Sequence, residues 1–421
     1  MSISIFTLNK IAKSYDLISA KIVSKFKRTK IQQKDKRKFV FDLYTELLNG
    51  EYKAKPLKKV QIPKSDVSKR DLKIPCFKDK VLQKIMSDFL NQKLNGIFSN
   101  RSYAYRPKKT PKQAVNRVVN NCKRFKWVID LDITKFFDTI DHDLLIQILK
   151  KYISDEKIIE LINQWIKIGD DSENDLNEKI HSVGIPQGSS ISPILANLFL
   201  HEVFDKWFEN EFPNSEFVRY ADDIVVHCTN VKDAQTIFGA ILNRFTYFKL
   251  QLHKKKSKII YCRRNHKRKS FYKKWKRSFI FLGFKISEEY ILNSKNQFIH
   301  QITPRVNEEK CNEIFQIIMN IQRNVKLDIR LLVKLLNLKL LGVLNYYTAL
   351  DYHFRERIKF KLNKLIFYSF KRTLPLKTQK IKWLILFLFK KFVLANSTRF
   401  FLWKNGASFI KDLEKKRVRF V

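Results

Sequence analysis

The sequence predicts an α+β fold, with a few short strands set in a chain that is otherwise largely helical. The first observation is a strand–turn–strand pattern, in which Ala221-Asp222-Asp223 separates the runs Glu216–Tyr220 and Ile224–Cys228. Apolar and β-branched residues on both sides of a short polar turn are typical of a hairpin, so two Asp are expected at its tip. The second observation is a basic, helical pattern rich in Leu, Phe and Tyr from about Asn307 to the C-terminus.

The charge of the chain indicates a polyanionic partner. Its 421 residues include 84 Lys plus Arg against 40 Asp plus Glu, which gives a formal net charge of +44. Nucleic acid is favoured over a membrane surface, because the basic residues are interleaved with 35 Phe, 15 Tyr and 6 Trp that suit base stacking. No apolar run reaches the roughly 18 residues that a membrane-spanning helix needs, so no membrane partner is expected.

The cysteines and the N-terminus indicate a cytoplasmic protein. Five widely spaced cysteines form no Cys-x-x-Cys pattern, so neither a zinc site nor a disulfide framework is expected. The segment Met1–Phe6 has no basic stretch before an apolar core, so no secretory signal is expected.

Acidic residues gather in one segment of this basic chain. Five of them follow or lie on the apolar strand predicted from Trp127, at positions 130, 132, 138, 141 and 143. Acid clustered against the overall charge indicates a metal site. Helix capping explains Asp141 or Asp143, since a helix is predicted at Leu144–Leu149, but capping does not explain Asp132.

Three further segments have the composition of ligand-binding loops, although a solvated loop explains the first of them equally well. Ser68–Gln83 reads as a basic turn, a short strand that Pro75 ends, and a helix that begins near Asp79. Gly184–Pro193 reads as a loop that opens a helix from Ile194 to about Glu209. Residues 251–280 are basic, contain no acid and are bracketed by strands, which predicts a nucleic-acid groove.

Five segments, taken in order, resemble the successive palm motifs of reverse transcriptases. They are Asp132 with Phe136-Phe137-Asp138, Pro186-Gln187-Gly188 with Ser192-Pro193, Tyr220-Ala221-Asp222-Asp223, Lys256-Ser257, and Phe281-Leu282-Gly283-Phe284. The resemblance covers roughly residues 60 to 350, and agreement of all five segments in this order is very improbable by chance. It implies a right-hand polymerase of α+β class, with fingers, a ferredoxin-like palm and a helical thumb.

Within that family, the chain is most similar to the bacterial group II intron type. Lys69-Arg70-x-Leu72-x-Ile74-Pro75 resembles its fingers motif, and the segment from Leu336 to Tyr347 resembles its thumb, or maturase X region. Two segments depart from the family pattern: Thr134-Lys135 stands where Lys-Gly is common, and Tyr105-Arg106-Pro107 replaces Gly-Phe-Arg-Pro. The sequence shows no Cys/His-bearing endonuclease domain, so a free-standing enzyme is expected.

The resemblance implies phosphoryl transfer assisted by two Mg²⁺ ions, with Mn²⁺ as a substitute. Asp132 and Asp222 would be bridging metal ligands and Asp223 the third catalytic carboxylate, while the backbone carbonyl of Ile133 would assist. Nucleotide-binding roles are implied for Lys69, Arg70, Phe137, Gln187, Gly188 and Lys256. The Phe137 ring would clash with a ribose 2′-hydroxyl and so select dNTPs, although a core Phe is a serious alternative.

The remaining implied contacts are with nucleic acid. The segment Phe281-Leu282-Gly283-Phe284 would form the primer grip. Contacts with template RNA are expected at Arg106, Lys108, Lys109 and Tyr346. The thumb would hold the RNA–DNA duplex that contains the cDNA product through its backbone and 2′-hydroxyl groups.

Four domains are expected from these assignments. They are a basic helical extension at 1–60, the fingers and palm at 61–285, a helical thumb similar to maturase X at 286–370, and a basic aromatic tail at 371–421.

The function expected is cDNA synthesis from a dedicated, structured non-coding RNA, by resemblance to defence-associated reverse transcriptases that act against phage. An intron maturase without an endonuclease, acting mainly as an RNA-binding splicing factor, is the alternative. A structural RNA-binding protein with an inactive palm is a third hypothesis, against which the intact Asp132, Asp222 and Asp223 argue. The oligomeric state and the primer are not predicted.

Overall fold

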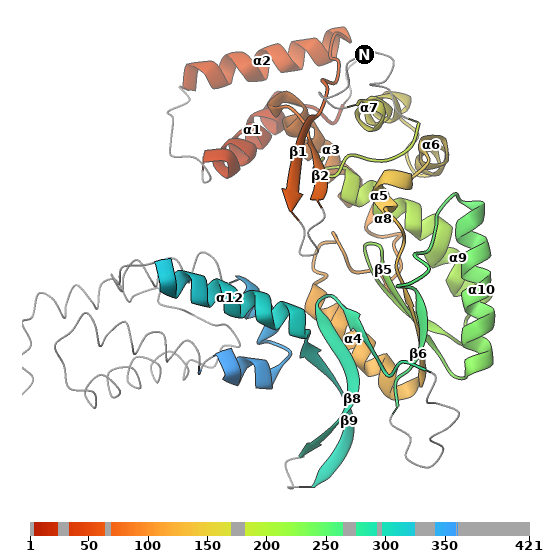
Figure 1. The fold of residues 1–421 in the computed structure, drawn as a ribbon. Coiled ribbons are helices and arrows are strands. Elements are labelled where there is room, and N and C mark those ends of the chain that lie inside the picture. Colours follow the sequence, from red (N-terminus) through yellow and green to blue (C-terminus); the bar gives the residue numbers. More distant parts are fainter. Residues whose placement is uncertain are drawn as a thin grey trace, which may run out of the picture. The chain divides into compact units, whose positions relative to one another are not determined.

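The computed structural model describes residues 4–23, 33–63, 69–169, 182–263, 275–292, 297–324, 342–358 and 360. The chain divides into two compact units, Met1–Ile260 and Tyr261–Val421, and each is described by itself. Figure 1 shows the elements in sequence order. Within the described residues, no helix has the length and apolarity needed to cross a membrane.

Two helices and a hairpin open the first unit. Helices α1 (Leu8–Val23) and α2 (Gln33–Asn49) pack against each other, and α1 also packs on α3 (Phe77–Leu94). Three rings close this corner, since Tyr15, Phe39 and Phe77 lie with their centroids 5.1 to 5.4 Å apart. The helix pair expected in residues 1–60 is therefore confirmed, and it packs on the following helix rather than standing apart.

The basic segment after it folds as expected. Strands β1 (Lys58–Pro63) and β2 (Lys69–Ile74) form an antiparallel pair, and Pro75 follows the last residue of β2. Helix α3 begins at Phe77, two residues before Asp79, because Cys76 takes the extended conformation of a helix cap. Asp79 still serves the helix, since it lies in the first turn where a negative charge is favourable.

A four-stranded sheet in the order β4-β5-β3-β6 forms the centre of the first unit. Its strands are β3 (Trp127–Leu131), β4 (Glu216–Tyr220), β5 (Asp223–Cys228) and β6 (Lys258–Tyr261). Strand β5 pairs antiparallel with both β4 and β3, so the predicted hairpin and the predicted strand from Trp127 are confirmed as neighbours.

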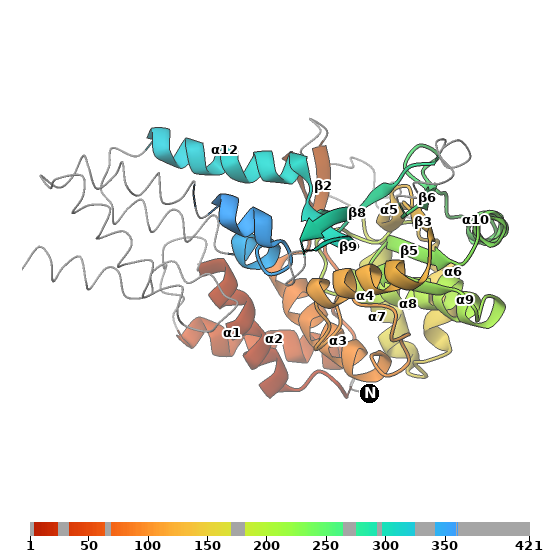
Figure 2. The ribbon, with the colours of Figure 1, turned by 90° about the horizontal axis from the view of Figure 1, so that it is seen from below.

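Different helices pack on the two faces of this sheet. On one face, Phe217 of β4 packs against Phe204 and Phe208, and Phe204 in turn packs on Phe245 of α10 (Val231–Tyr247). On the other face, α4 (Pro111–Arg124) packs on β4 and β5 (Figure 2). The Cys122 Sγ of α4 lies 3.8 Å from Nδ1 of His227 on β5. Alternate residues of a strand share one face, so Asp223 lies on the same face of β5 as His227. Asp130 of β3 pairs with Val225 and therefore lies on this α4 face too.

Three short helices follow β3 along the chain. They are α5 (Phe136–Thr139), α6 (His142–Lys150) and α7 (Glu156–Lys167). The Asp141 carboxylate accepts a hydrogen bond from the Leu144 N–H at 3.0 Å, which confirms the expected cap. The acidic residues of α6 thus stabilise a helix start, and they leave Asp132 as the carboxylate without a capping role.

The long helix predicted from Ile194 to about Glu209 is interrupted in its middle. It consists of α8 (Ser192–Leu200), a π-helical turn η1 (His201–Asp205) and α9 (Lys206–Glu211). A π-helical turn inserts one residue, and this rotates every later side chain relative to a regular helix.

The second unit contains the strand expected after the basic segment 251–280, and two more strands where a helical thumb was expected. β7 (Ser278–Phe281), β8 (Phe284–Leu292) and β9 (Phe298–Val306) form an antiparallel sheet, followed by α12 (Glu308–Asn324). Residues 286–292 and 298–306 of the expected helical thumb therefore form two paired strands. Alternating burial along these strands explains them, since Ile286 and Ile302 are buried and Lys285 is exposed. The predicted segment from Leu336 lies partly, and the tail at 371–421 wholly, outside the described residues.

Burial of His227 predicts a pH dependence of stability. Burial, followed by the positive charge of Arg117, lowers the pKa of His227 to about 3. An unfolded His titrates near 6.5, so the unfolded chain binds more protons between pH 6.5 and 3, and the free energy of unfolding falls as the pH falls through this window. Relative to His227→Leu, the wild type should lose about 1.4 kcal/mol per pH unit.

Urea unfolding at pH 7, 6 and 5 measures this difference. The variant His353→Gln, which removes an exposed histidine, is measured at the same pH values as the control for loss of a histidine. A gap between wild type and His227→Leu that stays constant across the three pH values would contradict the prediction.

Candidate active site

The two adjacent Asp lie at the tip of the β4–β5 hairpin, as the sequence predicts. Strand β4 ends at Tyr220, β5 begins at Asp223, and these two residues form the last pair of the ladder. Ala221 occupies the left-handed region with φ 58°, which lets two residues reverse the chain. The tight turn holds Asp222 and Asp223 at the end of a rigid sheet, where neither can move far from the other.

Asp132 is fixed just beyond the end of β3. The backbone N–H of Asp132 donates to the Ser257 hydroxyl at 3.1 Å, and its carbonyl accepts from the His253 N–H at 2.8 Å. Ile133 forms an isolated antiparallel bridge with Leu252. The loop 251–257 thus clamps the strand end, and Lys256 Nζ lies 3.2 Å from a carboxylate oxygen of Asp132.

The ladder register brings these carboxylates together. Leu131 of β3 pairs with Ile224 of β5, so one further step along the same register sets Asp132 opposite Asp223. Asp130 lies two residues earlier on the same face, with Lys258 Nζ 3.4 Å from its carboxylate. Three carboxylates from the ends of two strands, those of Asp130, Asp132 and Asp223, therefore share the part of the α4 face that lies toward the hairpin tip.

Electrostatic strain marks this group. Desolvation, and then the charges of Asp222, Asp130 and Asp132, raise the pKa of Asp223 to about 7, although the residue keeps contact with solvent. Desolvation raises the pKa of Asp130 to about 6 against the opposing effect of Lys258. The pKa of Asp222 is also raised, by desolvation and by the charge of Asp132. Carboxylates that raise one another's pKa are stabilised by a bound cation.

The donor set fits a hard divalent cation. Mg²⁺ prefers carboxylate and carbonyl oxygens, and Asp132, Asp222 and Asp223 supply them from rigid strand ends together with the Ile133 backbone. Among the described residues, no three His, Cys, Asp or Glu side chains are gathered closely enough to form a ready metal site. The ion pair between Lys256 and Asp132 balances part of the negative charge instead.

The loop with Gln187 and Gly188 packs directly on strand β2, which the sequence predicts to belong to the fingers. The Lys73 N–H donates to the Gln187 carbonyl at 2.9 Å, and the Gln187 side-chain amide donates to Asp138 at 3.2 Å. Gly188 has φ +132°, and a Cβ there would meet the Lys73 carbonyl oxygen at 2.8 Å. Only glycine allows this close approach, which ties β2 and its residues Lys69 and Arg70 to the loop.

The other predicted nucleotide-binding residues are accessible. Lys69 and Arg70 are exposed on β2, and the positive charge of Arg70 opposes the rise in the pKa of Asp222. Phe137 is half-buried, with its ring edge-on to the buried Phe136 at 5.8 Å. A ring that is part core and part surface is compatible with both interpretations made from the sequence.

Sequence reasoning missed two residues beside the carboxylates. Tyr105 is exposed and has φ 56°, and the charge of Asp222 follows desolvation as a cause of its raised pKa. Asp130 is the second: it was counted in the acidic cluster but given no role, although it lies two residues before Asp132 and so on the same face of the strand. Neither side chain belongs to the five segments that carry the family resemblance, and so neither was assigned.

The residues predicted to contact template differ in their surroundings. Arg106 donates to the carbonyl oxygens of Asn95, Ser99 and Ser102, so its guanidinium holds a loop together. Lys109 donates to the Asn100 carbonyl at 3.3 Å and lies over the Tyr103 ring, whereas Lys108 is exposed. RNA contact by these side chains stays a prediction, with Lys108 the most accessible of the three.

The predicted primer grip is the tight turn of a hairpin in the second unit. Phe281 pairs with Phe284, while Leu282 and Gly283 take φ 49° and 80°. The Tyr346 hydroxyl donates to the Leu282 carbonyl at 2.9 Å, and a Cβ on Gly283 would collide with the Tyr347 ring. Tyr346 therefore supports this turn.

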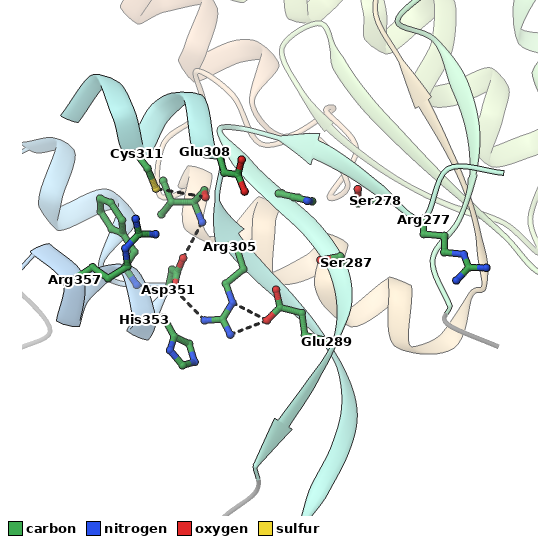
Figure 3. Close-up of a pocket in the computed structure, with 13 residues that line it drawn as sticks. Arg277, Ser278, Ser287, Glu289, Arg305, Glu308, Cys311, Asp351, His353 and Arg357 are labelled. Atoms are coloured by element: carbon green, nitrogen blue, oxygen red, sulfur yellow. Dashed lines mark hydrogen bonds and ion pairs between the residues drawn. The ribbon is translucent and has the colours of Figure 1, made fainter. Parts of the chain in front are cut away.

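A polar cavity of about 700 Å³ lies elsewhere in the second unit (Figure 3). Arg305 crosses it and pairs with both Glu289 and Asp351, at 2.7 and 3.2 Å. The Asp351 carboxylate also accepts from the N–H groups of Val306 and Phe354, so it fastens the following helix to β9. The charged groups of Arg305, Glu289 and Asp351 in the cavity are thus already paired with one another.

A family model and several curated relatives match this chain. The model described as reverse transcriptase (RNA-dependent DNA polymerase) matches residues 62–286, more than half of the chain. A putative COX1/OXI3 intron 1 protein of Saccharomyces cerevisiae is 33% identical over 274 residues, 64% of this chain and 32% of that protein. The group II intron-encoded protein LtrA of Lactococcus lactis is 34% identical over 158 residues, 37% of this chain and 26% of LtrA.

Other similarities are more distant or more partial. Protein YkfC of Escherichia coli is 31% identical over 219 residues, 44% of this chain and 57% of that protein. A telomerase structure from Candida albicans, in complex with a fragment of telomeric RNA, has a TM-score of 0.44 and 13% identity, covering 86% of this chain and 64% of that one. The chain spans only about a third of the length of the first of these curated relatives.

Proposed function

This chain belongs to the reverse transcriptase family and has its right-hand polymerase fold, and from that premise we propose that it copies RNA into DNA. The observation that carries the proposal is the register of β3 and β5, which sets Asp132 opposite Asp223 at the hairpin tip, next to Asp222. Desolvation, followed by the charges of neighbouring carboxylates that include Asp132, raises the pKa of both Asp222 and Asp223. Mg²⁺ is the proposed cofactor, as two ions, with Mn²⁺ as its substitute.

Different residues of this chain would have different roles in nucleotide addition. Arg70 and Lys69 would bind the triphosphate oxygens from β2, which the Gln187–Gly188 loop holds in place. Lys256, released from Asp132, would balance the charge of the leaving pyrophosphate. When bound between the carboxylates, divalent cations would stabilise the charge that develops on the attacking and leaving oxygens.

Primer extension tests the proposal. The purified chain should extend a DNA primer annealed to an RNA template with dNTPs and Mg²⁺, and the product should vanish when the cation is chelated. Extension on DNA template alone, with none on RNA, would overturn the assignment of template class.

The proposed template is a dedicated, structured non-coding RNA, and the proposed role is defence against phage. The alternative is an intron maturase that acts mainly by binding RNA, which similarity to group II intron-encoded proteins supports. The two are separated by sequencing the RNA and DNA that purify with the protein from cells. One enriched small RNA with complementary cDNA supports the first role, and intron RNA with little cDNA supports the second.

Phe137→Ala should admit ribonucleotides. The Phe137 backbone borders the loop that leads to Gln187, because its carbonyl accepts from the Ile185 N–H at 2.7 Å. We propose that the half-buried ring meets the sugar of an incoming nucleotide. Loss of a steric contact of this kind should lower the preference for dNTPs over NTPs by about tenfold or more. Single-nucleotide incorporation with each sugar measures the ratio.

Thermal unfolding of the same variant distinguishes the two interpretations of Phe137. A sugar-contacting ring should leave the melting temperature nearly unchanged. Unchanged sugar preference with a large loss of stability, of the kind expected for the buried Phe136→Ala, would return Phe137 to the core.

A further inference from the structure

We propose that Arg219 is a positioning residue of the active site: its buried guanidinium, held by Asp205, fixes the Ala221 carbonyl and thereby sets the position of Asp222. The inference rests on the proposed function, because it concerns the same carboxylates. It adds a residue that touches neither substrate nor cation and acts through the turn.

The guanidinium of Arg219 is fully buried and each of its nitrogens has a partner. Nε donates to one carboxylate oxygen of Asp205 at 2.7 Å and Nη2 donates to the other, so the pair is bidentate. Nη1 donates to the Asn197 side-chain oxygen at 3.0 Å and to the Ala221 carbonyl at 3.2 Å. One arginine therefore joins α8, η1 and the catalytic turn.

Asp205 is available for this pairing because the helix is π-helical at that point. The turn η1 ends at Asp205, whose side chain is fully buried, and Arg244 of α10 donates to the Val203 carbonyl at 2.9 Å within the same turn. Burial raises the pKa of Asp205, but the charge of Arg219 and the hydrogen bonds from His201 and Arg219 together outweigh burial and hold that pKa below its usual range. Asp205 is thus an ionised and immobile anchor.

The turn needs such an anchor because its backbone is strained. Ala221 adopts φ 58°, a conformation that L-residues with a side chain seldom take, and Asp222 is the next residue. The Arg219 backbone is fixed as well, since its N–H donates to the Arg101 carbonyl and its carbonyl accepts from Tyr103, both at 2.9 Å. The immobile Arg219 guanidinium therefore holds the Ala221 carbonyl in place and keeps Ala221 in this unfavourable conformation.

A purely structural ion pair makes a different prediction. Replacing a buried pair with apolar residues of similar volume is often neutral or stabilising, whereas removing one partner leaves an unpaired buried charge. The double variant Arg219→Met/Asp205→Leu should therefore fold, yet it cannot hold the Ala221 carbonyl. The double variant therefore distinguishes a contribution of the ion pair to folding stability from its effect on the position of Asp222.

The experiment compares this double variant with wild type in three measurements: thermal unfolding, template–primer affinity, and steady-state extension of a DNA primer on RNA. We expect a melting temperature and an affinity close to those of wild type, and a kcat lowered about 100-fold with an unchanged KM for template–primer. The control is Arg117→Gln. It removes an exposed arginine of α4 that pairs with Glu216, a residue of the same strand as Arg219, and it should keep wild-type kcat.

A readout without catalysis completes the test. Mn²⁺ added to the wild type, without nucleic acid, should raise the melting temperature, and the double variant should require several times more Mn²⁺ for the same rise. Wild-type kcat and an unchanged Mn²⁺ requirement in the folded double variant would overturn the proposal. A wild type that binds Mn²⁺ but makes no cDNA would overturn the proposed function alone, and the Mn²⁺ comparison would still decide the role of Arg219.

Discussion

Asp222→Asn should abolish polymerisation and leave RNA binding nearly unchanged. The substitution keeps the shape of the side chain but removes a charged oxygen ligand at the hairpin tip, where Asp132 and Asp223 lie close by. Loss of several kcal/mol of transition-state stabilisation corresponds to about a 10³-fold or greater fall in rate. RNA affinity should persist because it depends on a formal net charge of +44 spread over the chain.

The same variant should also be no less stable than wild type in the absence of divalent cations. The charge of Asp222 helps to raise the pKa of Asp223, so removing it relieves a repulsion that the folded protein otherwise carries. The matched control is Asp143→Asn, an exposed acid of the same acidic segment, which should retain activity. A large loss of RNA binding by Asp222→Asn would undercut the assignment of this residue as a cation ligand.

Gly188→Ala should move strand β2 away from the loop that contains Gln187 and Gly188. A Cβ at Gly188 would lie 2.8 Å from the Lys73 carbonyl oxygen, and φ +132° is unfavourable for any L-residue with a side chain. Backbone must therefore move, at a cost of about 1–3 kcal/mol in stability. Because β2 carries Lys69 and Arg70, a shift of about 1 Å should lower polymerisation by about 100-fold.

Urea unfolding and primer extension measure the two effects. Gly239→Ala is the control, because nothing lies within 4 Å of a Cβ at this position in α10 and alanine favours a helix. That variant should be as stable as wild type or slightly more so, with full activity. Equal behaviour of Gly188→Ala and Gly239→Ala would mean that the close contact with Lys73 does not hold the site together.

The central hairpin and the carboxylates could be predicted because their signals are local. Alternating apolar residues around Ala221-Asp222-Asp223 specify two strands and a turn, and a capping role was ruled out for Asp132 from its place on an apolar strand. Strands β8 and β9 were missed because an alternating pattern of modest length was outweighed by the helical segments that follow it.

Residues that act through long-range contacts could not be predicted in this way. The pairing of Arg219 with Asp205 depends on a π-helical turn, and nothing in the sequence distinguishes that turn from regular helix. Arg106 illustrates the converse, since a basic residue in an aromatic loop was expected to bind RNA, while its donors point to nearby backbone carbonyls. Only the tertiary structure shows which cations already have partners.

The clamp on Asp132 has a consequence for the order in which a ribosome delivers this chain. Its partners His253 and Ser257 are made more than a hundred residues after Asp132, and β6 follows them at Lys258–Tyr261. A nascent chain that has emerged only as far as Asp223 holds all three carboxylates but lacks the loop that fixes the first. Since pairing over such sequence distances forms late, the nascent chain should remain without activity until residues near 260 leave the exit tunnel.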